Sequence, residues 1–198
     1  SLFEQGQGDY LESRLPVLHS KQLIDVIEKL AFFPKKIYDL QNKFYATVLF
    51  DEASAQKDSI IERQTSFQSD RKNIILSAPH FYVSNPFYKT PRNVCEKNSD
   101  YDILDLVSLD ENYTPRTNYK PVDSSFINKL PTINDINFTN YYKISSNKMV
   151  DTAVERTYQV SILPKEFSHI SGIRSFLSND NELLVKVASF GVSLIADF

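Results

Sequence analysis

Proline placement is the feature of this 198-residue sequence that most restricts its fold. Four of the nine prolines fall between residues 84 and 121, at Pro86, Pro91, Pro115 and Pro121. Proline fixes its own φ angle, lacks an N–H donor and restricts the residue before it, so a long helix is excluded here. We expect stiff loops, interrupted by one strand at residues 103–109. Stiff loops suit a recognition surface, because they lose little entropy on binding.

Outside this segment, hydrophobic periodicity predicts alternating helices and short strands. Helices are expected at residues 19–33, 123–128, 134–143 and 179–196, strands at 43–50, 73–76, 81–83 and 157–163, and a helix or ordered loop at 51–63. Ser20 is the expected cap of the first helix, and Asn179 or Asp180 that of the last. The pattern predicts a mixed α/β or α+β fold with a twisted sheet, long Pro-rich loops and a few packed helices.

Composition indicates a folded, soluble domain. Hydrophobic residues make up 41% and charged residues 24%, which supports a core. Cys95 is the only cysteine, so an internal disulfide is excluded and a cytoplasmic location is expected. The sequence shows no signal peptide and no apolar run long enough for a membrane span. We expect one domain over residues 1–198, with a possible helical segment at 1–40. Because Ser1 is not Met and the end at Phe198 interrupts an apolar run, we expect a fragment of a longer protein.

Charge distribution points to one surface that could bind nucleic acid. The formal net charge of −3 and a pI near 5.6 count against such binding, because most of its affinity comes from neutralising phosphates. Basic residues nevertheless cluster among tyrosines at residues 80–98 and 113–122. Arginine pairs with guanine, asparagine with adenine, and lysine with phosphate. The predicted base readers are Arg92, Arg116 and Asn118, the predicted phosphate contacts are Lys89, Lys97 and Lys120, and Tyr88 and Tyr113 complete the set. Ordinary surface charge on loops is the alternative.

Catalytic motifs are incomplete, and we predict no catalytic or metal-ligating residue. Residues 85–88 (NPFY) approach the Asn-Pro-Pro-Tyr motif of amino-group DNA methyltransferases, but Phe87 replaces the second proline. Residues 3–8 contain a lone Gly-x-Gly with no strand before it, which is a weak signal for a methyl-donor loop. The acidic residues at 100–111 fit a solvated face better than a nuclease site. An enzyme remains an alternative if His80, Asn85 and Asp102 converge in a deep pocket.

A longer resemblance connects these segments. Residues 74–92 (IILSAPHFYVSNPFYKTPR), 101–106 and 113–119 (YTPRTNY), followed by 155–157, 162–165 and 169–170, resemble a region of bacterial adenine-specific DNA methyltransferases, including the fused type IIG restriction–modification enzymes. In that family the region lies after the catalytic motifs and recognises the target, with an architecture similar to type I specificity subunits. The resemblance implies double-stranded DNA as the partner. It also implies an upstream methyltransferase domain in the same chain, which binds S-adenosylmethionine, whereas this fragment holds no cofactor. A protein–protein interaction or scaffolding domain is the alternative.

Overall fold

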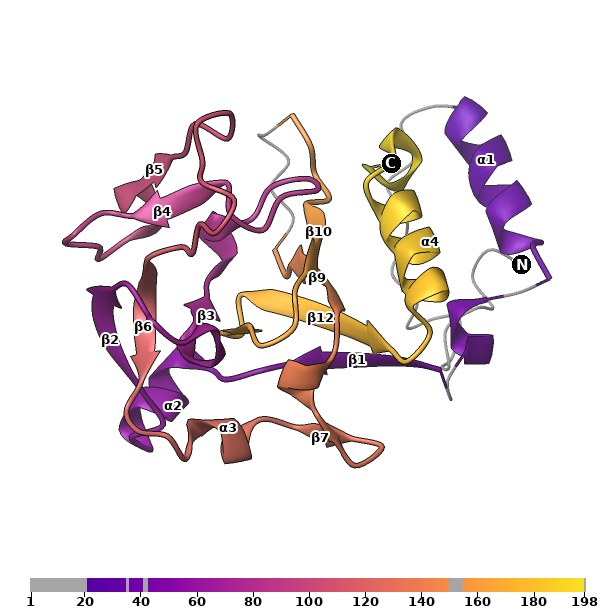
Figure 1. Ribbon diagram of the computed structural model, residues 1–198. Coiled ribbons are helices and arrows are strands. Elements are labelled where there is room, and N and C mark those ends of the chain that lie inside the picture. The colour runs from indigo at the N-terminus through magenta and orange to yellow at the C-terminus, as the bar shows by residue number, and fades with distance from the viewer. Residues whose placement is uncertain (1–20, 35, 41–42, 150–154, 198) are drawn as a thin grey trace. The chain divides into compact units, whose positions relative to one another are not determined.

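The structure is a computed structural model that describes residues 21–34, 36–40, 43–149 and 155–197 (Figure 1). The chain divides into two compact units, Ser1–Gln41 with Phe198, and Asn42–Asp197. In the first unit, the described residues form helix α1 (Lys21–Ala31) and a short 3-10 helix, η2 (Ile37–Leu40). The predicted first helix is therefore confirmed, whereas its predicted cap, Ser20, lies outside the described residues.

The first sheet of the larger unit is antiparallel throughout. Its order is β1 (Phe44–Val48), β12 (Ile173–Ser178), β9 (Lys143–Asn147) and β10 (Val160–Leu163). Helix α4 (Asn181–Gly191) packs on this sheet, as Figure 1 shows, and buries Leu184 and Ala188 against Ile144 and Val160. Asp180 Oδ1 accepts a hydrogen bond from Leu183 N at 3.0 Å, which caps the helix.

The second sheet brings together strands that lie far apart in the sequence. Its order is β11 (Ser168–His169), β3 (Ile75–Leu76), β6 (Thr117–Pro121) and β2 (Ile61–Ser66). Strands β11 and β3 are parallel, and the other pairs are antiparallel. Helix α2 (Glu52–Lys57), capped by Asp51, leads into β2. Strand β6 is central in this sheet, although it belongs to the Pro-rich segment.

Smaller elements complete the larger unit. Strand β4 (Lys89–Pro91) pairs with β5 (Tyr101–Ile103), and β7 (Thr132–Ile133) pairs with β8 (Ile136–Asn137). The short helices are α3 (Phe126–Lys129), η3 (Arg71–Asn73), η4 (Ala78–His80), η5 (Asn98–Asp100), η6 (Phe138–Asn140) and η7 (Leu194–Asp197). The mixed α+β class is confirmed, with two four-stranded sheets in place of a single twisted sheet. None of the helices in the described part of the chain has the length and apolar character that crossing a membrane requires.

Three predicted elements are wrong. No strand forms at residues 81–83, where Tyr82 makes only an isolated bridge with Asn85. The strand expected at residues 103–109 is instead β5, which ends at Ile103, and Asp105 then forms a turn by accepting from Val107 N at 3.1 Å. No helix spans residues 134–143. Asn134 and Asp135 have φ angles of 49° and 61°, a left-handed turn that joins β7 to β8 and cannot continue a helix.

The core of the first sheet contains a buried polar network. Ser145 Oγ and Ser175 Oγ lie 2.8 Å apart, and Ser175 Oγ lies 2.7 Å from His169 Nε2. His169 Nδ1 lies 2.9 Å from the Ile170 carbonyl oxygen, so Nδ1 carries the proton and Nε2 accepts from Ser175. Lys143 is also fully buried and donates to the Tyr141 carbonyl oxygen at 2.9 Å. Burial lowers the pKa of Lys143 to about 7 and that of His169 to about 4.

Candidate nucleic-acid interface

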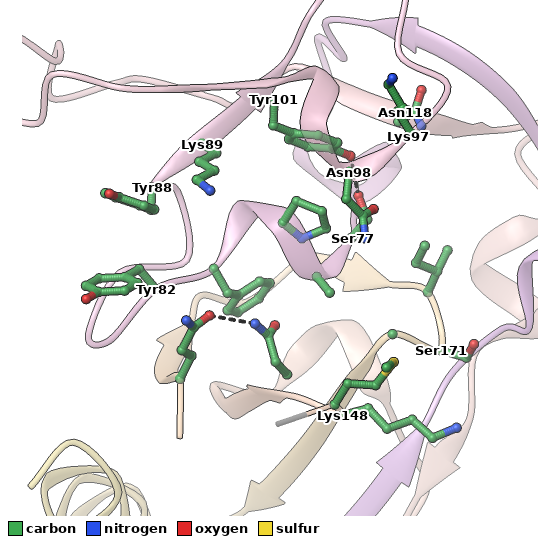
Figure 2. Close-up of a pocket in the computed structure, with 18 of the residues that line it drawn as sticks. Ser77, Tyr82, Tyr88, Lys89, Lys97, Asn98, Tyr101, Asn118, Lys148 and Ser171 are labelled. Carbon is green, nitrogen blue, oxygen red and sulfur yellow. Dashed lines mark hydrogen bonds between the residues drawn. The ribbon is translucent and has the colours of Figure 1, made fainter. Parts of the chain in front are cut away.

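A groove of about 1150 Å³ opens within the larger unit (Figure 2). One wall comes from η4 and the segment that forms β4, η5 and β5, and the opposite wall from the ends of β9 and β10 and from residues 170–172. Figure 2 shows Tyr82, Tyr88 and Lys89 on one side of this groove and Lys148 and Ser171 on another. The nearest lining residues of the two walls, Tyr101 and Asn147, lie 46 residues apart in the sequence, so tertiary folding creates the groove.

Four of the eight predicted contact residues line the groove, namely Tyr88, Lys89, Lys97 and Asn118. The rings of Tyr82 and Tyr88 stack with centroids 4.8 Å apart, and Lys89 Nζ lies 5.6 Å from the Tyr88 centroid. These contacts hold an ammonium group beside an aromatic platform. Such a combination suits a ligand that carries both phosphate and aromatic bases.

Asn118 is held in a defined orientation. The residue is only 6% exposed, and Thr65 Oγ1 donates to its Oδ1 at 3.0 Å. Because the oxygen keeps a second lone pair and the NH₂ group carries two donors, the amide retains the donor–acceptor pattern that pairs with adenine.

Charge in the groove is mixed. Four cationic and three anionic side chains line it: Arg63, Lys89, Lys97 and Lys148, with Glu52, Glu96 and Glu155. Arg63 has a structural role, because its Nη2 donates to the carbonyl oxygens of Cys95 at 3.0 Å and Glu96 at 2.6 Å. The lysines are therefore the cations best placed to bind phosphate.

Sequence reasoning missed one wall of the groove. Asn147 Nδ2 donates to Gln159 Oε1 at 2.7 Å. Asn147 Oδ1 is buried with no hydrogen-bond partner among the described residues. Lys148 follows directly and also lines the groove. No local pattern marked these residues, because the expected helix ends at Lys143 and strand β9, which Asn147 ends, was not predicted. A buried acceptor without a partner is costly, so it favours a donor supplied by a ligand or by water.

The other four predicted residues lie outside the lining of the groove. Arg92 forms an ion pair with Asp102, and Lys120 Nζ lies 2.8 Å from Glu62 Oε1. Arg116 Nη1 donates to Asn93 Oδ1, and its guanidinium carbon lies 5.3 Å from the centroid of Phe67. Tyr113 is half-buried, which raises its pKa. The contact of Arg116 with Asn93 brings the two Pro-rich segments side by side.

The residues considered for catalysis do not converge. His80 is fully buried, with Nε2 3.0 Å from the Arg116 carbonyl oxygen and Nδ1 3.2 Å from Ser77 N. A neutral ring with its proton on Nε2 satisfies both contacts, and burial lowers the pKa of His80 accordingly. Asn85 Oδ1 accepts from Phe87 N at 2.7 Å, whereas Asp102 pairs with Arg92. The NPFY segment is thus a turn whose asparagine oxygen is already engaged.

Among residues 21–34, 36–40, 43–149 and 155–197, no group of three or more His, Cys, Asp or Glu side chains is arranged to hold a metal ion. Comparison of the chain with protein-family models, curated proteins and solved structures finds no match.

Proposed function

We propose that this chain is the sequence-specific DNA recognition module of an adenine-specific DNA methyltransferase or restriction–modification enzyme. The observation that carries the proposal is the groove in which Tyr88, Lys89, Lys97 and Asn118 meet. All four were singled out from sequence for contacts of this chemistry, within residues 80–98 and 113–122. The resemblance of residues 74–92 to the recognition region of such enzymes gives independent support.

In this proposal the duplex docks along the groove. Lys89, Lys97 and Lys148 neutralise phosphates, whereas the amide of Asn118 contacts a base edge. Methyl transfer belongs to an upstream domain of the same protein, which binds S-adenosylmethionine and receives the flipped adenine. The chain itself contributes docking and choice of sequence.

Binding of a fluorescently labelled random-sequence duplex tests the proposal. The chain should bind the duplex, and Lys89→Ala or Lys97→Ala should weaken binding similarly for every sequence, by roughly three- to tenfold each. Lys186→Ala is the matched control, because Lys186 is exposed on α4 outside the groove and pairs with Glu182 at 2.6 Å. Equal losses in the control and the groove variants would contradict the proposal, as would an absence of salt-dependent binding.

A protein–protein interaction module is the second candidate, and one observation favours it. The segment that carries β4 and β5 exposes large apolar side chains: Val94, Ile103, Leu106 and Val107. Val107 is 95% exposed, and exposed apolar groups close together are typical of docking surfaces. This reading predicts that groove variants leave partner binding unchanged and that Val107→Asp abolishes it.

A further inference from the structure

We propose that Asp102 is a positioning residue that presents Arg92 to guanine, and that Asn93 presents Arg116 to a second base beside it. The inference rests on the proposed function and specifies its substrate as duplex DNA whose recognised site contains guanine. It adds guanine recognition at the edge formed by the two Pro-rich segments to the phosphate and base contacts proposed for the groove.

The hydrogen bonds of Arg92 leave one edge of its guanidinium group free. Asp102 Oδ1 accepts from Arg92 Nε at 2.9 Å, and Arg92 Nη2 lies 2.8 Å from the same oxygen in an ion pair. A guanidinium group has five N–H donors, so the donors of Nη1 and the second donor of Nη2 remain. These form the end-on pair that binds O6 and N7 of guanine. The side chain of Arg92 is 55% exposed, so this edge is open to a ligand.

The backbone fixes where Arg92 and Asp102 lie relative to each other. Thr90 faces Asp102 across the β4–β5 ladder, and Arg92 N donates to Asp100 O at 2.9 Å just beyond it. Side chains two residues apart share a face of a strand, so Arg92 and Asp102 are diagonal neighbours. A long side chain held by a hydrogen-bonded strand pair loses less conformational entropy on binding than a free one.

Arg116 is held by a different set of contacts on the neighbouring segment. Asn93 Oδ1 accepts from its Nη1, Phe67 lies against its guanidinium group, and His80 binds its carbonyl oxygen. Asp102 also lies close enough to Arg116 for its pKa to be lowered by both arginines, by Arg92 first. Asp100 also interacts electrostatically with Arg92, so the two arginines of this edge face two carboxylates, of which Asp102 alone makes the hydrogen bond to Arg92.

The inference is tested with the 198-residue chain in two steps. The chain first selects its preferred duplex from a library randomised over one helical turn. Its affinity is then measured for the selected duplex and for single-base variants of that duplex. Asp102→Ala should lower the preference for guanine over adenine at one position by about tenfold. The same change removes a negative charge, so affinity for random duplex should rise or stay constant. Asp102→Asn, which keeps an acceptor, should restore part of the preference. Asn93→Ala should lower the preference at a second position.

Two controls make the result specific. Asp105→Asn removes the same charge from an exposed position and keeps the acceptor for Val107 N, so it should leave base preference unchanged. Arg92→Lys keeps the charge but loses the bidentate edge, so it should lose the preference while still binding. A selected site without guanine, or an unchanged preference in Asp102→Ala, would overturn the inference while the proposed function stands. Failure of the unmodified chain to bind any duplex would overturn the proposed function instead.

Discussion

Single buried side chains contribute to both the stability of this protein and the position of its candidate binding surface. His80 is the clearest example, because its two ring nitrogens connect η4 to the residue before β6. The ring has no exposed surface, so every group that it satisfies would otherwise be buried without a partner.

His80→Ala should therefore reduce the free energy of unfolding by about 2–4 kcal/mol, since it leaves the Arg116 carbonyl and Ser77 N–H unpaired and creates a cavity. Chemical denaturation measures this loss. Ser108→Ala, at an exposed turn, is the control and should change stability by less than about 0.5 kcal/mol. A loss as small as that in His80→Ala would show that these hydrogen bonds contribute little.

Lys143 predicts an unusual dependence of stability on pH. The folded pKa of about 7 lies below the ordinary value of 10.5, so between these limits the unfolded chain binds the proton more strongly. Stability should rise with pH across this window, by up to about 3–5 kcal/mol from this group. Below pH 7 the folded and the unfolded chain both carry the proton on Lys143, and the stability gained at higher pH is lost. His169, Lys165 and the Phe138 ring surround the amine and add no anion to stabilise its charge.

The measurement is the difference in unfolding free energy between the wild-type protein and Lys143→Met, taken across the pH range. This difference cancels the groups that both proteins share. It should grow with pH above about 7. A flat difference would mean that Lys143 keeps its ordinary pKa in the fold.

At the scale of elements, long periodic segments were predictable and short strands were not. The predictions of α1, β1, β10 and α4 are confirmed, because each follows a clear hydrophobic period over several residues. Strand β6 was missed, since its sequence TNYKP contains polar residues and proline. Thr117 and Asn118 are buried there, and Asn118 accepts from Thr65, which lies more than 50 residues away in the sequence, so only tertiary packing makes this a central strand.

In the candidate site too, some residues could be predicted from the sequence and others could not. Tyr88 and Lys89 could be chosen from local composition, and so could Lys97, because basic and aromatic residues cluster there. Lys148 and Gln159 could not, since they belong to the other wall of the groove and no local pattern connects them with it. The pairing of Arg92 with Asp102 depends on the register of β4 and β5, which the sequence did not predict.

Packing of α4 on β10 gives a prediction at this scale. A Cβ atom at Gly191 would lie 3.0 Å from Val160 Cγ1 and 3.4 Å from Tyr158 Cε1, so a larger side chain must displace these two side chains. Gly191→Leu should lower thermal stability by about 1–3 kcal/mol despite the better helix propensity of leucine. Ser189→Leu, at an exposed position of the same helix, should not be destabilising. Equal stability of the two variants would contradict close packing at Gly191.

For the molecule as a whole, the net charge of −3 limits how DNA can be bound. Three groove lysines, Lys89, Lys97 and Lys148, imply a slope of about −3 when the logarithm of the binding constant is plotted against that of salt concentration. Titrations at several salt concentrations measure this slope. A slope steeper than about −6 would require phosphate contacts elsewhere on the chain.

Arg63 holds the segment before η5 in a way that leaves its side chains free to vary, which affects how ligand specificity could change. Its guanidinium group binds main-chain oxygens of Cys95 and Glu96 and no side chain of that segment. Substitutions at Lys97 or Asn98 therefore leave the anchor intact. A library varied at these two positions should yield folded proteins with altered ligand preference, which makes this segment a natural starting point for reprogramming by directed evolution.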